Sequence, residues 1–147
     1  MGGMFSGLIQ SSAPKARAQA AAIVITTPAT PKHAGLAVSA VAGLNGGIAF
    51  HISGRGMAGA VATDVVLQVR FGTGVPPVLD AAVTGTQVGL STTLKELLTG
   101  LTADHNFGLK DLITGLTPGT TYWVDIAASC ASGNATLNDV IVNLEPY

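Results

Sequence analysis

Three histidines are the first candidates for chemistry in this chain of 147 residues, because imidazole can act as a general base or a metal ligand. His33, His51 and His105 lie far apart in the sequence, so a site would need further ligands or a positioned partner supplied by the fold. His51 shares one face of an alternating run with Ala49 and Ser53, and His105 lies in TADHNFG, which is typical of a polar turn. We predict neither a catalytic nor a metal-binding histidine, with one alternative left open: a symmetric trimer could bring three copies of one histidine together.

Cysteine and acidic residues give no stronger signal for catalysis. Cys130 is the single cysteine, and a nucleophilic thiol would need a histidine base and an orienting group, neither of which is indicated. The eight acidic residues show no DxDxDG spacing for calcium and no obvious catalytic pair. The segment GRGMAG (54–59) lacks the GxxxxGK[ST] phosphate-binding pattern. We therefore predict a protein that is not an enzyme and binds no cofactor or metal.

The single tryptophan is the remaining candidate for binding. Trp123 and Asp125 share the face of a predicted strand opposite Tyr122. If exposed, this face would offer an aromatic platform for a sugar or a partner protein. If covered, Trp123 would pack between subunits, which we favour because tryptophan is enriched at the buried centres of interfaces.

The composition favours assembly. Only 10% of the residues are charged, against about 25% in a typical soluble domain, while 48% are hydrophobic and 19 are glycine. So few charges leave an exterior poorly protected against association. The net charge of −1, with scattered lysines and arginines, does not favour nucleic-acid binding. No apolar run approaches the roughly 20 residues of a membrane span, so we expect no membrane partner.

From Ile23 onward the pattern is that of short strands separated by Gly, Pro and Asn turns, which predicts one all-β domain over residues 23–147. The clearest strand is TDVVLQVRF, in which Val65, Leu67 and Val69 face one way. A helical turn is plausible only over Thr93–Leu98. Pro118 and Gly119 predict a tight turn with a positive φ at the glycine, before a strand that places alternate residues from Tyr122 onward on one face.

Residues 1–22 lack this alternation and are predicted to form an N-terminal arm. A short helix could begin at Pro14, since proline after a serine is a common helix start. We expect the arm to dock on neighbouring subunits; the alternative is an arm folded back on its own domain.

A long uncharged excursion, FGTGVPPVLDAAVTGTQVG (71–89), follows the clearest strand. Its glycines supply bends, Pro76 and Pro77 stiffen an extended piece, and Asp80 is its one charged residue. Such a composition is unlike that of disordered chains. We expect an ordered connection that crosses the sandwich edge between opposite sheets, near a subunit interface.

Three segments in this order carry a resemblance: RFGTGVPPVLDAAVTGTQVG, LITGLTPGTTYWVDIAAS and GNATLNDVIVNLEPY. They resemble jelly-roll proteins of tailed bacteriophages and prophages, in which a YGTG segment precedes a GLTPGTTYW strand; Phe71 stands in place of that tyrosine. The resemblance covers Asp64–Tyr147. It implies a domain similar to the trimeric jelly rolls of the tumour-necrosis-factor type, serving in the virion as a decoration, head-fibre or tail-appendage protein.

A second resemblance stays open beside the first. GLTPGTTYWVDI is similar to a strand entry of fibronectin type III domains, where a tyrosine hydroxyl bonds back to the turn. Against it, the single tryptophan lies late in the chain, and the β region exceeds the roughly 100 residues of one such sandwich.

The sequence thus predicts a jelly-roll β-sandwich that assembles as a homotrimer and attaches through its arm to other virion proteins of a capsid or tail. The alternative is a carbohydrate- or receptor-binding β-sandwich, with a surface glycan as its ligand, such as a tail-appendage tip or a fibronectin type III-like adhesin domain. A hydrolase on a β scaffold is a third reading, which requires a pocket with two carboxylates. The residues predicted to serve anchoring and the interface are Met4, Phe5, Leu8, Ile9 and Trp123.

Overall fold

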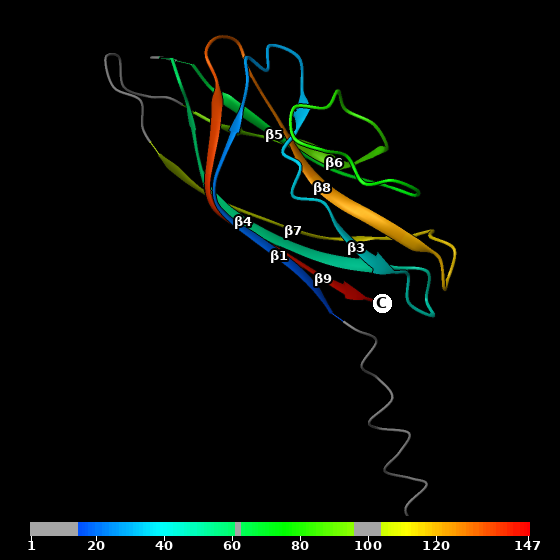
Figure 1. Cartoon of the computed structure of the whole chain (residues 1–147). Coiled ribbons are helices and arrows are strands. Elements are labelled where there is room, and N and C mark those ends of the chain that lie inside the picture. Colours follow the sequence, from blue (N-terminus) through cyan, green and yellow to red (C-terminus); the bar gives the residue numbers. More distant parts are fainter. Residues whose placement is uncertain (1–14, 61–62, 96–103) are drawn as a thin grey trace, which may run out of the picture.

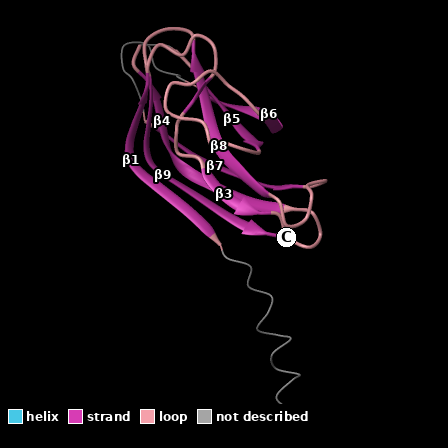
Figure 2. Cartoon of the chain, turned by 45° about the vertical axis from the view of Figure 1, so that its right-hand side comes forward, coloured by secondary structure: helices cyan, strands magenta, loops and turns pink. Residues whose placement is uncertain are grey.

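The computed structural model describes residues 15–60, 63–95 and 104–147, and within these ranges the chain is all-β (Figures 1 and 2). Within the same ranges no helix is long and apolar enough to cross a membrane. The nine strands are β1 (Ala16–Ile25), β2 (Lys32–His33), β3 (Val38–Val41), β4 (Ile48–Ala58), β5 (Val65–Gly72), β6 (Thr86–Leu94), β7 (His105–Ile113), β8 (Thr121–Cys130) and β9 (Ala135–Pro146).

The strands form two antiparallel sheets, which confirms the prediction of an all-β, sandwich-like fold. Sheet A has the order β1-β9-β4-β7. Sheet B has the order β2-β8-β5-β6, and β3 also pairs with β8. The pairing is nested along the chain: β1 pairs with β9, β2 and β3 with β8, β4 with β7, and β5 with β6. Two further pairs, β4–β9 and β5–β8, complete the sheets.

The core lies between the sheets and follows the predicted alternation. Ile48, Phe50 and Ile52 of β4 are buried, whereas His51 is exposed on the outer face of sheet A. In β8, Val124 and Ile126 belong to the core and the half-buried Tyr122 packs against it. Alternate residues of each strand therefore point inward, as the sequence pattern predicted.

The predicted short helix is wrong for residues 16–22, which form the first part of β1; this stretch follows the alternative in which the arm folds back on its own domain. Ala16 pairs with Leu144 and Ala22 with Asn138, so this stretch belongs to sheet A. Arg17 is exposed while Ala16 and Ala18 are half-buried, the alternation of an edge strand. Pairing with β9 outweighs alanine's weak preference for helix. The remainder of the predicted arm, with Met4, Phe5, Leu8 and Ile9, lies outside the described residues.

The long connection after β5 also differs from the prediction. It joins β5 to β6, which are neighbours in sheet B, so it does not cross between opposite sheets. The predicted helical turn over Thr93–Leu98 is wrong at its start, where β6 runs to Leu94, and residues 96–98 lie outside the described part of the chain.

Candidate functional site

The connection between β5 and β6, residues 73–85, folds over the outer face of sheet B; we call it the covering loop (Figure 1). Beneath it lies a second buried layer. Trp123, Asp125 and Ala127 of β8 point away from the core between the sheets, yet Trp123 is only 3% exposed and the other two are fully buried. His33 of β2, opposite Ala127 in the register, is also fully buried. This layer holds the most chemically distinctive residues of the described structure.

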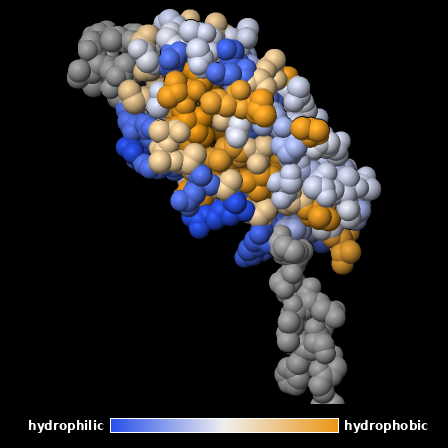
Figure 3. All heavy atoms as spheres, in the orientation of Figure 1, coloured by the Kyte–Doolittle hydropathy of each residue, from blue (hydrophilic) through white to orange (hydrophobic). Residues whose placement is uncertain are grey.

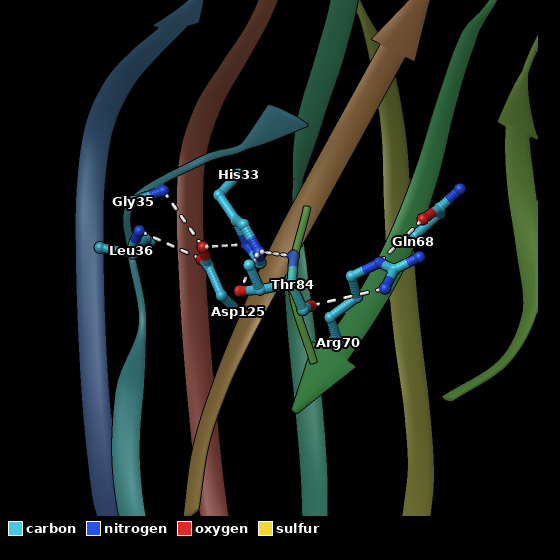
Figure 4. A network of polar contacts seen from close by, with 7 residues as sticks. All are labelled: His33, Gly35, Leu36, Gln68, Arg70, Thr84 and Asp125. Atoms are coloured by element: carbon cyan, nitrogen blue, oxygen red, sulfur yellow. Dashed lines mark hydrogen bonds and ion pairs between the residues drawn. The ribbon is translucent and has the colours of Figure 1, made fainter. Parts of the chain in front are cut away.

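A buried His33–Asp125 pair forms the centre of the layer (Figure 4). The Nδ1 atom of His33 lies 3.0 Å from Oδ2 of Asp125. The backbone N–H of Thr84, in the covering loop, donates to Nε2 of His33 at 3.1 Å, and the Thr84 hydroxyl lies 3.4 Å from the same nitrogen. Residues from β2, β8 and the loop thus meet at one imidazole.

These contacts fix the protonation of His33. Because Nε2 accepts a hydrogen bond from a backbone amide, it carries no proton, so Nδ1 is protonated and donates to Asp125. The order hydroxyl, imidazole, carboxylate is that of a nucleophile triad. Here, however, the lone pair that a general base would use is already bonded to the Thr84 amide. The arrangement therefore holds the loop in place and does not activate the hydroxyl.

Asp125 has additional donors. The N–H of Gly35 donates to Oδ2 at 3.2 Å and that of Leu36 to Oδ1 at 3.1 Å. A buried carboxylate is tolerated only when such donors surround it. Asp125 therefore fixes the chain after β2 as well as the histidine, and its oxygens are occupied by the fold itself.

Trp123 is buried by its own chain. Its Nε1–H donates to the Thr73 carbonyl at 3.2 Å, and its ring meets His33 edge-on with centroids 5.6 Å apart. Glycines make room for the indole: a Cβ at Gly72 would lie 2.6 Å from Cζ2, and one at Gly85 2.6 Å from Cη2. Trp123 thus offers no exposed platform and has little surface left to bury at a subunit interface.

The middle of the covering loop is held by its one acidic residue. Asp80 accepts the Thr26 N–H at 2.7 Å, and its own N–H donates to the His33 carbonyl at 3.1 Å. The hydrogen bond from Thr26, together with nearby Lys32, holds the pKa of Asp80 below its ordinary value. The single charge of the loop is therefore used to fasten it.

Arg70 of β5 fastens the far end. Its Nη1 donates to the Gly85 carbonyl at 3.0 Å and to the Thr84 carbonyl at 3.4 Å, while Nε donates to Gln68 (Figure 4). Together with Trp123 at the start and Asp80 in the middle, Arg70 completes a set of anchors along the whole loop. Its order, predicted from composition, is confirmed.

The underside of the covering loop is polar, and its upper side is apolar. Val75 is 90% exposed, Val78 70% and Leu79 47%; we call these three residues the loop crest. Apolar residues also form a broad area on the face shown in Figure 3. A fixed backbone that presents three aliphatic side chains is suited to contact another apolar surface, because little ordering is needed on binding.

The other predicted candidates lie apart from this site. His51 is exposed on the outer face of sheet A, and His105 is half-buried at the start of β7. Cys130 is buried, and burial raises the pKa of its thiol, as expected for an inert cysteine. In the part of the chain that the structure describes, no three His, Cys, Asp or Glu side chains are grouped as metal ligands.

Sequence reasoning missed the His33–Asp125 pair. The two residues are 92 positions apart, and His33 lies in a strand of two residues with no alternation to read. One signal was available: Asp125 interrupts an otherwise apolar strand, and a carboxylate in such a place needs a buried partner.

Comparison with protein-family models and with curated proteins finds no match for this chain.

Proposed function

We propose that this protein is a non-enzymatic structural component of a phage-like virion, a jelly-roll homotrimer that associates through its loop crest. The observation that carries the proposal is the rigid, uncharged crest of Val75, Val78 and Leu79, fastened from below by buried polar contacts. Association is the activity that such a surface supports, because burying aliphatic side chains is favourable and the fixed loop loses little entropy.

The nested pairing of the strands supports the jelly-roll assignment. In a jelly roll, a long antiparallel ribbon is rolled up so that the first strand pairs with the last, the second with the next to last, and so on inward. The pairs β1–β9, β2 and β3 with β8, β4–β7 and β5–β6 follow that scheme when β2 and β3 count as one interrupted strand.

The apolar exterior supports self-association. The exposed large hydrophobic residues of the described structure are Val24, Val41, Leu44, Val75, Val78, Leu79, Leu90 and Tyr147. Single exposed aliphatic residues are ordinary on protein surfaces. Three of them within five residues of one ordered loop are a different matter, and such patches mark interaction sites.

The place in a virion rests on the resemblance of Asp64–Tyr147 to phage jelly rolls. Lys15 directly precedes edge strand β1 and lies beside Glu145 of β9, where their side chains form an ion pair at 3.5 Å. Lys15 therefore lies at the same end of the sandwich as Glu145. We propose that residues 1–14, with Met4, Phe5, Leu8 and Ile9, attach the protein to the capsid or tail.

The exposed-aromatic form of the carbohydrate-binding alternative loses its support, because the indole of Trp123 lies beneath the covering loop. The Tyr122 hydroxyl does accept the Thr117 N–H at 3.1 Å, the local contact of a tyrosine corner. That contact belongs to the turn and carries no ligand argument.

The test measures the molecular mass of the assembly that the purified full chain forms in solution at micromolar concentration. We expect a trimer that dissociates when the crest is made polar by the double substitution Val75→Ser and Val78→Ser, with an unchanged far-UV circular dichroism spectrum. Leu44→Ser is the matched control, because Leu44 is 96% exposed in the turn before β4, away from the covering loop. A monomeric parent chain, or dissociation caused equally by Leu44→Ser, would overturn the proposal.

Attachment is tested separately. Deletion of residues 1–14 should leave the trimer intact and abolish binding to particles that lack this protein. Retention of binding by the shortened chain would show that the attachment surface lies within the sandwich.

A further inference from the structure

The outer face of sheet A carries a row of four polar side chains, one from each strand. Arg17 of β1 lies opposite Asn143 of β9, Asn143 opposite His51 of β4, and His51 opposite Lys110 of β7. All four are exposed, and their neighbours along each strand point to the core. We call them the cross-strand row.

Among the described residues, neither cation of the row forms an ion pair. The ion pairs of the described residues join Lys15 to Glu145, Arg55 to Asp104 and Asp139, and Lys95 to Asp64. Arg17 donates only to the neutral Gln19, at 3.1 Å, and Lys110 has no acidic partner among the described residues. Around the row, the three cations Lys15, Arg17 and Lys110 lie near the two carboxylates Asp111 and Glu145, and Glu145 is paired with Lys15, so the local charge is net positive.

The row borders a hollow in the sheet surface. The hollow has a volume of about 560 Å³ and is lined by the four residues of the row, by Ala49, and by the charged side chains of Lys15, Asp111 and Glu145. Ala49 lies two positions before His51 in β4, on the same face of the sheet. Its short side chain accounts for the depression in the surface at this point. A shallow depression with the small apolar Ala49 inside a polar and charged rim suits a ligand that has both apolar and polar sides.

The spacing of the row selects an extended ligand. Three steps between strands at about 4.8 Å each separate the backbones of Arg17 and Lys110 by about 14 Å. A single phosphate or sulfate is too small to reach both cations. A ligand that uses both must carry two negative groups, with neutral polar groups between them facing Asn143 and His51.

The direction of the row excludes a β-strand ligand. An extended peptide recognises a sheet by pairing with an exposed edge, where backbone groups are free. The row crosses the strands at right angles, and its central members lie on β9 and β4, each paired on both sides. Recognition here must come from side chains alone.

We infer that the cross-strand row binds an acidic oligosaccharide, with Arg17 and Lys110 each contacting a carboxylate and Asn143 and His51 hydrogen-bonding sugar hydroxyls. Arginine and lysine both bind carboxylates by charge-assisted hydrogen bonds. The apolar floor at Ala49 receives the C–H side of a sugar ring. This site is separate from the loop crest and does not depend on trimer formation.

The experiment titrates the full chain with tetragalacturonate, a linear oligosaccharide with one carboxylate on each sugar, by isothermal titration calorimetry at low ionic strength. Maltotetraose is the neutral comparison, and a tetraglutamate peptide and inorganic sulfate are the acidic non-sugar comparisons. We expect binding of tetragalacturonate only, weakened at least tenfold by the double substitution Arg17→Ala and Lys110→Ala. Ala49→Leu, which fills the hollow without changing charge, should also abolish it.

Lys95→Ala is the matched control, since it removes an exposed cation at the end of β6 and should leave the affinity unchanged. The conservative Lys110→Arg should retain binding. Absence of tetragalacturonate binding by the folded parent, equal binding of tetraglutamate or sulfate, or an equal loss with Lys95→Ala would each overturn the inference. The mass of the Arg17→Ala and Lys110→Ala variant, measured in parallel, should match that of the parent, which keeps this result distinct from the trimer test.

Discussion

Sheet B is covered on its outer face by a loop from its own chain, whereas no described segment covers the outer face of sheet A. Beneath the loop, Trp123, Asp125 and His33 form a second buried layer with its own polar contacts. The equivalent positions of sheet A carry exposed or half-buried side chains such as His51 and Ser53. One sheet is therefore closed by its own chain, and the other remains open to a ligand or a neighbour.

The comparison also separates two uses of polar groups. On sheet B, the imidazole and the carboxylate have all their hydrogen-bonding groups occupied inside the protein, so they contribute order. On sheet A, Arg17 and Lys110 lie at the surface and form no ion pair with the described acidic residues. A histidine beside an aspartate is thus weaker support for function in this fold than an unpaired arginine beside a histidine and an asparagine.

The largest effect is expected at Trp123. Trp123→Ala should lower the free energy of unfolding by about 3–5 kcal/mol, because it empties the space beneath the covering loop and frees the Thr73 carbonyl. Urea denaturation followed by circular dichroism measures this. Trp123→Phe should recover most of the loss. A change in the alanine variant below about 1 kcal/mol would mean that the layer under the loop is not a true core.

Gly85→Ala should have the second largest effect on the free energy of unfolding. The new Cβ would lie 2.3 Å from the Phe71 carbonyl oxygen, and φ at this position is +69°. Left-handed strain and overpacking together predict a loss of about 2–4 kcal/mol in the free energy of unfolding. Gly74→Ala is the control, since φ there is +81° but no atom lies within 4 Å of the Cβ. Equal losses at the two glycines would argue against close packing of the loop on Trp123.

A matched pair of alanines compares the two faces directly. Ala127→Leu, under the covering loop, should lower the free energy of unfolding by about 1–3 kcal/mol through overpacking. Ala49→Leu, on the bare face, should change it by no more than about 0.5 kcal/mol. Thermal and urea unfolding of the two variants side by side measure the difference. Equal effects would mean that the two outer faces are covered alike.

The smallest expected effect is the loss of the Asp80–Thr26 hydrogen bond at low pH. The pKa of Asp80 is lowered in the folded state, so its contact with Thr26 stabilises the protein fully above the ordinary value of 3.8 and is lost as pH falls through the lowered one. Hydrogen exchange at the Thr26 amide should accelerate in that range, after correction for the intrinsic pH dependence. In Asp80→Asn this dependence should vanish. A Thr26 amide whose protection has the same pH profile in both proteins would contradict the assignment.

Much of the sandwich could be predicted from local pattern. Alternation in β4 and β5, and the turn before β8, identified these strands and the residues that face the core. Pro118 and Gly119 form the predicted turn: Gly119 has a φ of +77°, and the Thr120 N–H donates to the Thr117 carbonyl at 3.1 Å. These features depend on residues only a few positions apart, so they can be recognised from the sequence alone.

The remainder depends on contacts across the chain. Nothing local distinguishes the alanine-rich first part of β1, residues 16–22, from a helix, because its strand state comes from pairing with β9 more than a hundred residues later. The covering loop shows its order in its composition, but its position depends on His33 and Trp123, which are remote in sequence. The cross-strand row is equally hidden, since only the register of four strands brings its members together.

The antiparallel pairing of β1 with β9, which brings Lys15 beside Glu145, has a mechanical consequence. A pull between residues 15 and 147 would separate β1 from β9 one pair of hydrogen bonds at a time, so the force required would be small. A pull between residue 15 and the turn at 131–134, at the opposite end of the sandwich, would load the bonds of β1 in shear, so that many must break together. A protein held at residue 15 and pulled at the turn 131–134 would therefore resist far more tension than the same protein pulled between residues 15 and 147.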